Sequence, residues 1–263
     1  MSILSRLLFP PPPSLFITTM SVMSFVGLLN GLSEVRGKHL RYSKFMNTNS
    51  PTYGKEIKLP SRIGMLVAYT PALIVGLASL SILDTGGPRC LLLNSALSVH
   101  FFKRVVEVLF VHQYSGHMIL DSVIAICLSY FISTLTMIYA QHLSQGMEEP
   151  SVDLKSAGII LFLIGITGNF YHHYLLSKLR ERDDKRYKIP KGGLFELVVC
   201  PHYLFEIIGF IGIACISQTV YAFSFTLGIL FYLMGRSYAT RKWYISKFKN
   251  FPTNVRALIP YIF

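Results

Sequence analysis

The chain has 263 residues, of which 52% are hydrophobic and only 14% carry a charge, and its net charge is +12. Soluble domains usually contain about 25% charged residues. This composition therefore excludes a disordered chain, a coiled coil and a disulfide scaffold, and it argues against an ordinary soluble enzyme. An apolar chain with excess positive charge is typical of a membrane protein with basic loops, or of a protein that binds an anionic ligand.

Seven apolar segments approach or reach the length of about 20 residues that a membrane-spanning helix needs. In chain order they are Leu15–Leu32, Ile63–Leu83, Cys90–Val111, Met118–Ala140, Ala157–Leu176, Leu204–Ile216 and Val220–Gly235. The sixth is short, and the apolar stretch before it, Leu194–Tyr203, is expected to bend or re-enter the membrane because it contains Pro201. The sequence thus predicts an all-α, polytopic membrane bundle of about seven transmembrane helices, with residues 1–263 forming one membrane domain.

The Lys and Arg residues gather in three segments outside the predicted helices. Seven lie between the first and second helices, seven follow the fifth, and six are in the C-terminal tail, out of 25 in the chain. With seven helices these segments share one side of the membrane, and positive loops stay in the cytosol, so the C-terminus is predicted to be cytosolic. The first apolar segment is expected to be an uncleaved anchor, because basic residues follow it instead of preceding it. Most of the charge thus sets topology. This charge distribution predicts contact with membrane lipids and argues against binding of nucleic acid. It does not indicate a protein partner.

Ionisable residues inside the third predicted helix are the first indication of a functional site. His100, Lys103, Arg104 and Glu107 share one helical face. Ionisable groups are costly at membrane depth and usually serve a function there. The alternative is a structural ion pair within the helix, between Lys103 or Arg104 and Glu107.

The fifth predicted helix ends in a polar and aromatic run, which consists of Asn169, Tyr171, His172, His173 and Tyr174. The alternative here is an aromatic belt at the membrane surface. The two adjacent histidines point to different helical faces, and the four cysteines show no zinc-binding spacing, so no metal site is predicted.

Three basic clusters are expected to converge on the cytosolic face. They lie after the fifth helix, around the turn that Pro190 and Gly192–Gly193 impose, and in the tail around Arg236 and Trp243. Such clusters suit a phosphorylated cofactor whose lipid-like substrate reaches into the bilayer. The alternative for the tail is anchoring to lipid headgroups. The sequence has no glycine-rich motif of the Rossmann or P-loop kind, so a nucleotide would bind in another way.

Three runs of residues together resemble the steroid 5α-reductase family, which includes very-long-chain enoyl-CoA reductases and polyprenol reductases. These runs are Tyr187–Glu196, Cys200–Gly209 and Leu258–Phe263. The resemblance is strong over residues 155–263 and is traceable from Leu59 onward. It implies a seven-helix enzyme of the endoplasmic reticulum membrane that uses NADPH to reduce a C=C bond conjugated to a carbonyl.

The resemblance also implies a set of cofactor-binding residues, by position in the family motifs. They are Asn169, Arg180, Tyr187, Lys188, Glu206, Arg236 and Tyr244. Arg and Lys would bind phosphates. At the position of a cofactor-contacting Asp in the steroid reductases this chain has His173, and Thr240 replaces a histidine of the tail.

The substrate end departs further from the steroid reductases. Where they polarise the 3-oxo group with a Glu and a Tyr, this chain has Tyr69 and Phe101. The pair Lys103–Arg104, and Tyr203 after Cys200-Pro201-His202, are instead similar to the enoyl-CoA reductases. The resemblance therefore implies Tyr203 and Tyr69 as candidate catalytic donors, with Lys103 or Arg104 lowering the pKa of a nearby phenol. Either tyrosine could instead be a packing residue.

The resemblance favours reduction of a 3-oxo-Δ4 steroid. One alternative is the trans-2-enoyl-CoA reductase reaction of very-long-chain fatty acid elongation. An alternative of another class is a non-catalytic scaffold that binds NADPH, which the missing Glu and Tyr motivate. A transporter would also tolerate buried charges, but the ordered motifs and the lack of an internal repeat argue against it.

Overall fold

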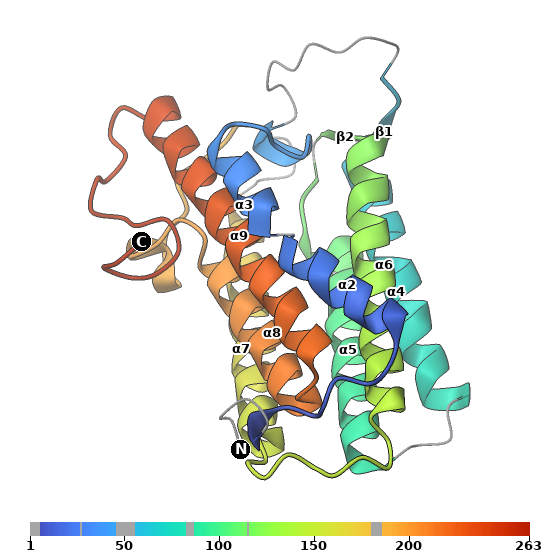
Figure 1. The fold of residues 1–263 in the computed structure, drawn as a ribbon. Coiled ribbons are helices and arrows are strands. Elements are labelled where there is room, and N and C mark those ends of the chain that lie inside the picture. Colours follow the sequence, from blue (N-terminus) through green and yellow to red (C-terminus); the bar gives the residue numbers. More distant parts are fainter. Residues whose placement is uncertain (1–5, 27, 46–55, 83–86, 115, 180–185) are drawn as a thin grey trace.

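The computed structural model describes residues 6–26, 28–45, 56–82, 87–114, 116–179 and 186–263, and it confirms an all-α bundle (Figure 1). The α-helices, in chain order, are α2 (Leu15–Val26), α3 (Leu28–Val35), α4 (Ser61–Ile82), α5 (Pro88–Val106), α6 (Leu120–Leu143), α7 (Lys155–Lys178), α8 (Pro201–Ser217) and α9 (Val220–Lys247). The shorter elements are the 3₁₀ turns η1 (Ser43–Phe45) and η3 (Gly193–Glu196), the π-helical turn η2 (Glu107–Val111), and the strands β1 (Lys58–Pro60) and β2 (His117–Ile119).

Several helices are long enough to cross a membrane. Within the described residues, five helical segments combine that length with an apolar composition, and they are Leu15–Val35, Ser61–Ser81, Leu120–Leu143, Lys155–Lys178 and Val220–Lys247. Helix α8 is shorter, as predicted, and the expected bend before it is present as η3. Helix α5 has the length to span but carries ionisable residues near both ends.

Two predicted helix boundaries are wrong. Met118 and Ile119 were expected to open the fourth helix, but they form β2, which pairs antiparallel with β1, so the helix begins at Leu120. The last helix was expected to end at Gly235 but continues to Lys247. Gly235 is a packing residue, because a Cβ placed on it would lie only 2.2 Å from the carbonyl oxygen of Gly31. Small residues at such crossings allow two helices to approach closely.

Helix α7 packs along α8 through glycines on both helices. A Cβ on Gly165 would lie 2.3 Å from the backbone nitrogen of Gly209, and one on Gly158 would lie 2.7 Å from the oxygen of Gly212. This close contact fixes the spacing between the polar end of α7 and the start of α8.

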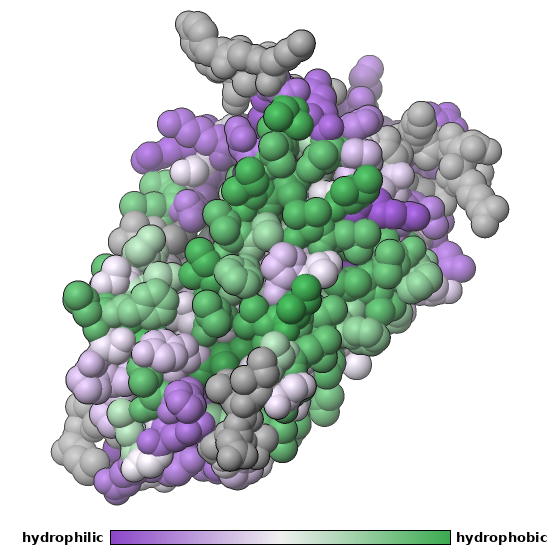
Figure 2. Space-filling model, turned by 90° about the vertical axis from the view of Figure 1, so that its right-hand side faces the viewer, coloured by the Kyte–Doolittle hydropathy of each residue, from purple (hydrophilic) through white to green (hydrophobic). Residues whose placement is uncertain are grey.

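The outside of the bundle is apolar. Figure 2 shows hydrophobic side chains over the middle of one face and hydrophilic side chains toward its ends. Exposed large apolar residues occur on many helices, for example Ile74 on α4, Phe102 on α5 and Leu163 on α7. This distribution fits a multi-pass membrane protein, because the helices present apolar side chains where lipid would lie.

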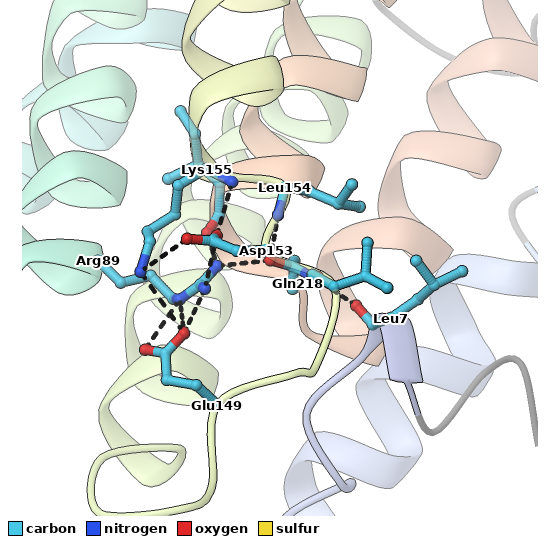
Figure 3. A network of polar contacts seen from close by, with 9 residues as sticks. Leu7, Arg89, Glu149, Asp153, Leu154, Lys155 and Gln218 are labelled. Carbon is cyan, nitrogen blue, oxygen red and sulfur yellow. Dashed lines mark hydrogen bonds and ion pairs between the residues drawn. The ribbon is translucent and has the colours of Figure 1, made fainter. Parts of the chain in front are cut away.

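A buried arginine at the start of α5, at the end of the bundle opposite the two strands (Figure 1), joins three chain segments (Figure 3). Arg89 on α5 donates to the carbonyl oxygen of Ile216 at 2.7 Å and to Gln218 Oε1 at 2.9 Å. It also pairs with Glu149 and, at 3.2 Å, with Asp153. Gln218 Nε2 in turn donates to the carbonyl oxygen of Leu7 at 2.6 Å. This network ties the N-terminal segment and the loop after α6 to the turn between α8 and α9.

Replacing Arg89 with Met is expected to destabilise the protein by about 1–3 kcal/mol, because Ile216 and Gln218 lose buried hydrogen-bond donors. Thermal unfolding of the detergent-solubilised protein measures this loss. Lys155→Met is the matched control. Lys155 pairs at 3.6 Å with Glu149 and at 3.3 Å with Asp153, both about half exposed, and such exposed pairs contribute at most about 1 kcal/mol. Equal stability of the Arg89→Met variant and the wild type would contradict this role.

The Arg89 network should also make stability depend on pH. The hydrogen bond from Arg89 holds the pKa of Glu149 below its usual value against the effect of burial. A carboxyl group with a lowered folded-state pKa adds stability above its unfolded pKa of about 4.3 and loses it as the pH falls through the folded pKa. Stability should therefore fall in this acidic range, and less so in Arg89→Met. Parallel pH profiles for the two proteins would contradict the coupling.

Candidate active site

A cavity of about 580 Å³ opens at the end of the bundle that carries β1 and β2. Its walls come from residues 42–44, β1, the segment after η2, the C-terminal end of α7, residues 186–190, the start of α8 and the far part of α9. Four basic side chains line it, and they are Lys44, Lys58, Arg186 and Lys188. Five tyrosines line it as well, namely Tyr42, Tyr114, Tyr187, Tyr203 and Tyr244. Cations beside flat aromatic rings suit an anionic ligand that also carries an aromatic group.

Aromatic rings gather along one side of this cavity. The rings of Tyr187 and Trp243 meet edge to face with centroids 4.8 Å apart. Lys44 Nζ lies 4.5 Å from the ring centre of Tyr244 and 5.4 Å from that of Trp243. Tyr244 is held from behind by stacking on Phe248 and Phe251.

A buried network of charges lies beside the cavity, between α4, α5 and α7. Glu107 is fully buried, and its two oxygens lie 2.9 Å from Lys103 Nζ and 2.9 Å from Arg104 NH1. The two ion pairs that the sequence analysis considered, from Lys103 and from Arg104 to Glu107, are therefore both present. The same side chains also contact residues on other helices. Arg104 NH2 donates to the hydroxyl of Tyr69 at 2.5 Å.

The same network reaches α7 through His173 and Asn169. His173 Nδ1 lies 3.0 Å from Glu107 Oε1 and 3.2 Å from Arg104 NH1, and Lys103 donates to Asn169 Oδ1. Asn169 also donates to the carbonyl oxygen of His202, at 2.7 Å. The charges thus join the polar faces of three helices and reach the start of α8.

His112 connects this network to the cavity. It lines the cavity wall, and its Nε2 lies 3.9 Å from Glu107 Oε2. Burial, followed by the nearby His173, lowers the pKa of His112 to about 2, so its imidazole is neutral at physiological pH. The sequence analysis did not predict that His112 faces the cavity.

Three ligand-type side chains of this region come close enough to suggest a metal. Single ligand atoms of Glu107, His112 and His173 lie within 4.8 Å of one another. However, Lys103 and Arg104 already contact both oxygens of Glu107. A metal ion would have to displace a buried cation, so the charges of this cluster do not favour one.

Comparison with known proteins places the chain in a family. A family model described as 3-oxo-5-alpha-steroid 4-dehydrogenase matches residues 116–263. A rat protein named 3-oxo-5-alpha-steroid 4-dehydrogenase 2 is 30% identical over 232 residues, which are 86% of this chain and 89% of the rat chain.

The chain belongs to the 3-oxo-5-alpha-steroid 4-dehydrogenase family. This confirms the prediction of a steroid 5α-reductase-like enzyme. A steroid 5-alpha-reductase named DET2 from Gossypium hirsutum is 42% identical over 108 residues, which are 41% of this chain and 42% of its own. The human protein named 3-oxo-5-alpha-steroid 4-dehydrogenase 2 is 28% identical over 241 residues, or 89% of this chain and 92% of the human chain.

Four of the residues singled out by the family motifs line the cavity, namely Tyr187, Lys188, Tyr203 and Tyr244. Arg180 lies outside the described residues. Tyr69, Lys103, Arg104 and Asn169 do not line the cavity but form the buried network beside it. Glu206, also buried, lies 3.4 Å from the hydroxyl of Tyr130 and likewise does not line it.

Arg236, which was predicted to bind a phosphate of the cofactor, is buried at the contact between α9 and α3. It is only 1% exposed and does not line the cavity. Its guanidinium pairs with both oxygens of Glu34 on α3, at 3.1 and 3.0 Å. In this structure the guanidinium is thus paired with a buried carboxylate.

Tyr42, Lys44 and Lys58 are among the cavity residues that sequence analysis missed. They precede the region where the resemblance is strong, and the two lysines were attributed to membrane topology. The pairing of β1 with β2 and the bridge between Tyr42 and Met118 bring them to the cavity. Because these paired segments are far apart in the chain, no local sequence pattern predicts that they meet.

Proposed function

We propose that the protein is a membrane-bound, NADPH-dependent reductase of a C=C bond conjugated to a carbonyl in a lipid, and that the lipid is a 3-oxo-Δ4 steroid. Its relatives carry names that describe this reaction. The observation that carries the proposal is the cavity itself. Its basic and aromatic walls include Tyr203 and His112, and His112 lies 3.9 Å from the buried Glu107.

The cavity suits NADPH in size and chemistry. Its volume of about 580 Å³ is within the range of about 300–1,000 Å³ typical of small-molecule sites. Lys44, Arg186 and Lys188 would hold phosphate groups. Tyr187 and Tyr244 offer ring faces for the flat parts of the cofactor. When bound, the cofactor would supply the hydride that reaches the β-carbon of the substrate.

Tyr203 is the donor best placed to polarise the substrate carbonyl. It lines the cavity, whereas Tyr69 is buried behind it and hydrogen-bonded to Arg104. A hydroxyl aimed at the carbonyl oxygen stabilises the enolate charge that develops after hydride transfer. Lys103 is linked to the residue before Tyr203 through Asn169, which donates to the carbonyl oxygen of His202. A proton must then reach the α-carbon.

We assign the cavity end of the bundle to the cytosol and the membrane to the endoplasmic reticulum. Among the described basic residues, Lys44 and Lys58 before α4 and Arg186 and Lys188 after α7 line the cavity at this end, as positive residues of cytosolic loops do. The C-terminus would then be cytosolic as well. The family resemblance supports the organelle.

A second candidate substrate is a trans-2-enoyl-CoA. Lys103 and Arg104, which resemble the pair of the enoyl-CoA reductases, form the centre of the buried network. A non-catalytic scaffold is the candidate of another class, because Tyr69 and Phe101 replace the acids of the steroid reductases.

One assay separates these functions. Microsomes that contain the protein are given NADPH with either a 3-oxo-Δ4 steroid or a trans-2-enoyl-CoA, and NADPH consumption and the saturated product are both measured. The proposal expects turnover of the steroid. Turnover of the enoyl-CoA alone would favour the second substrate, and NADPH binding without turnover of either would favour the scaffold.

A further inference from the structure

The segment Lys38–Phe45, which we call the strap, supplies one wall of the cavity without belonging to any α-helix of the bundle. Tyr42, Ser43 and Lys44 of the strap line the cavity. Backbone hydrogen bonds connect the strap to β2 and to the start of α6. The nitrogen of Arg41 donates to Ser122 Oγ at 2.9 Å, and the nitrogen of Ile119 donates to the Arg41 oxygen at 3.3 Å.

Arg236 on α9 contacts three residues of the strap. Its NH1 donates to the carbonyl oxygen of Leu40 at 3.3 Å. The guanidinium carbon lies 4.4 Å from the ring centre of Tyr42 and 4.1 Å from that of Phe45. A planar guanidinium can contact two rings and still donate hydrogen bonds from its edge, which a lysine cannot do.

Glu34 fixes the same side chain from α3. Besides its pair with Arg236, Glu34 Oε2 lies 2.5 Å from His39 Nδ1, and Oε1 accepts from the backbone nitrogen of Leu40 at 3.4 Å. Both charged partners are almost fully buried. A buried pair loses its hydration, so it persists only where such additional hydrogen bonds hold its geometry. Here those bonds go to the strap.

We propose that Arg236 is a positioning residue that, together with Glu34, fixes the strap so that Tyr42 and Lys44 complete the cavity wall. In this role Arg236 does not itself bind a phosphate of the ligand. The consequence for NADPH rests on the proposed function, but the consequence for the strap does not.

The binding experiment distinguishes the two roles of Arg236 by the sign of one effect. If Arg236 bound a phosphate, Glu34 would compete for it, and Glu34→Gln would lower the Kd for NADPH. If Arg236 positions the strap, Glu34→Gln and Arg236→Gln should both raise the Kd, by about tenfold. Glu34→Gln added to Arg236→Gln should cost little more, because both act through one contact. The exposed Glu148 provides the matched control, Glu148→Gln, with an unchanged Kd.

A second readout needs no cofactor. The chain has a single tryptophan, Trp243, and Lys44 of the strap lies over its ring. Release of the strap should expose Trp243 to water and shift its emission to longer wavelength in cofactor-free Glu34→Gln and Arg236→Gln, but not in Glu148→Gln. Arg236→Lys, which keeps the charge and is less disruptive to folding, should show the same shift.

Unchanged Trp243 emission in Glu34→Gln, Arg236→Gln and Arg236→Lys would overturn the proposal. A lower Kd for NADPH in Glu34→Gln would also overturn it and would restore Arg236 as a phosphate ligand. Failure of the wild type itself to bind NADPH would instead contradict the proposed function, while the emission shift would still test the strap.

Discussion

Tyr203→Phe should lower kcat by about 100-fold to 1,000-fold, which is the usual effect of removing one hydrogen-bond donor from a developing oxyanion. The phenyl ring keeps the packing of Tyr203, which lies at the cavity wall with its ring 4.3 Å from that of His202. The KM for NADPH should therefore change little. Steady-state kinetics with saturating NADPH and a 3-oxo-Δ4 steroid measure the effect.

The control for this variant is Tyr261→Phe, since Tyr261 is 77% exposed and does not line the cavity. Its kinetics should match the wild type. If Tyr203→Phe retained the full kcat, Tyr203 would not be the donor. Tyr69, with its hydroxyl held by Arg104, would then be the next residue to test.

The second large effect is expected at Glu107, on stability. Glu107→Gln should destabilise the protein by about 3–5 kcal/mol, because it leaves Lys103 and Arg104 buried without their carboxylate. Thermal unfolding in detergent measures the loss, and the exposed Glu148→Gln is the matched control. Because one unpaired cation is then removed, Lys103→Met combined with Glu107→Gln should recover part of the loss.

Two results would contradict this account of Glu107. One is a Glu107→Gln variant as stable as the wild type. The other is a double variant that loses stability by the sum of the two single losses, since independent sites add and coupled charges do not.

The bundle could be predicted from the sequence because lipid imposes simple requirements. Helices must be long and apolar, and the predicted Ala157–Leu176 and Leu204–Ile216 differ from α7 and α8 by only a few residues at each end. The two wrong helix boundaries, at Met118 and Gly235, occur where a residue has a role that composition does not reveal. Gly235 was taken as a helix end, although its lack of a side chain serves a crossing with Gly31.

The candidate site could be predicted only in part. Tyr187, Lys188 and Tyr203 occur in contiguous motifs, and the structure places them at the cavity. Arg236 is also in a familiar position, but its environment depends on Glu34, which is 202 residues away in the chain. No local pattern records that pair, so a buried structural arginine and a phosphate-binding arginine look identical in sequence.

The most direct test of the proposed chemistry follows the hydride. Membranes that contain the protein are incubated with a 3-oxo-Δ4 steroid and NADPH that carries deuterium at the transferable position of the nicotinamide, and the product is examined by mass spectrometry. The account predicts a saturated 3-oxo steroid with one deuterium at the β-carbon, and the same product formed about 100-fold to 1,000-fold more slowly by Tyr203→Phe. No reduced steroid, or a reduced steroid without deuterium, would contradict it.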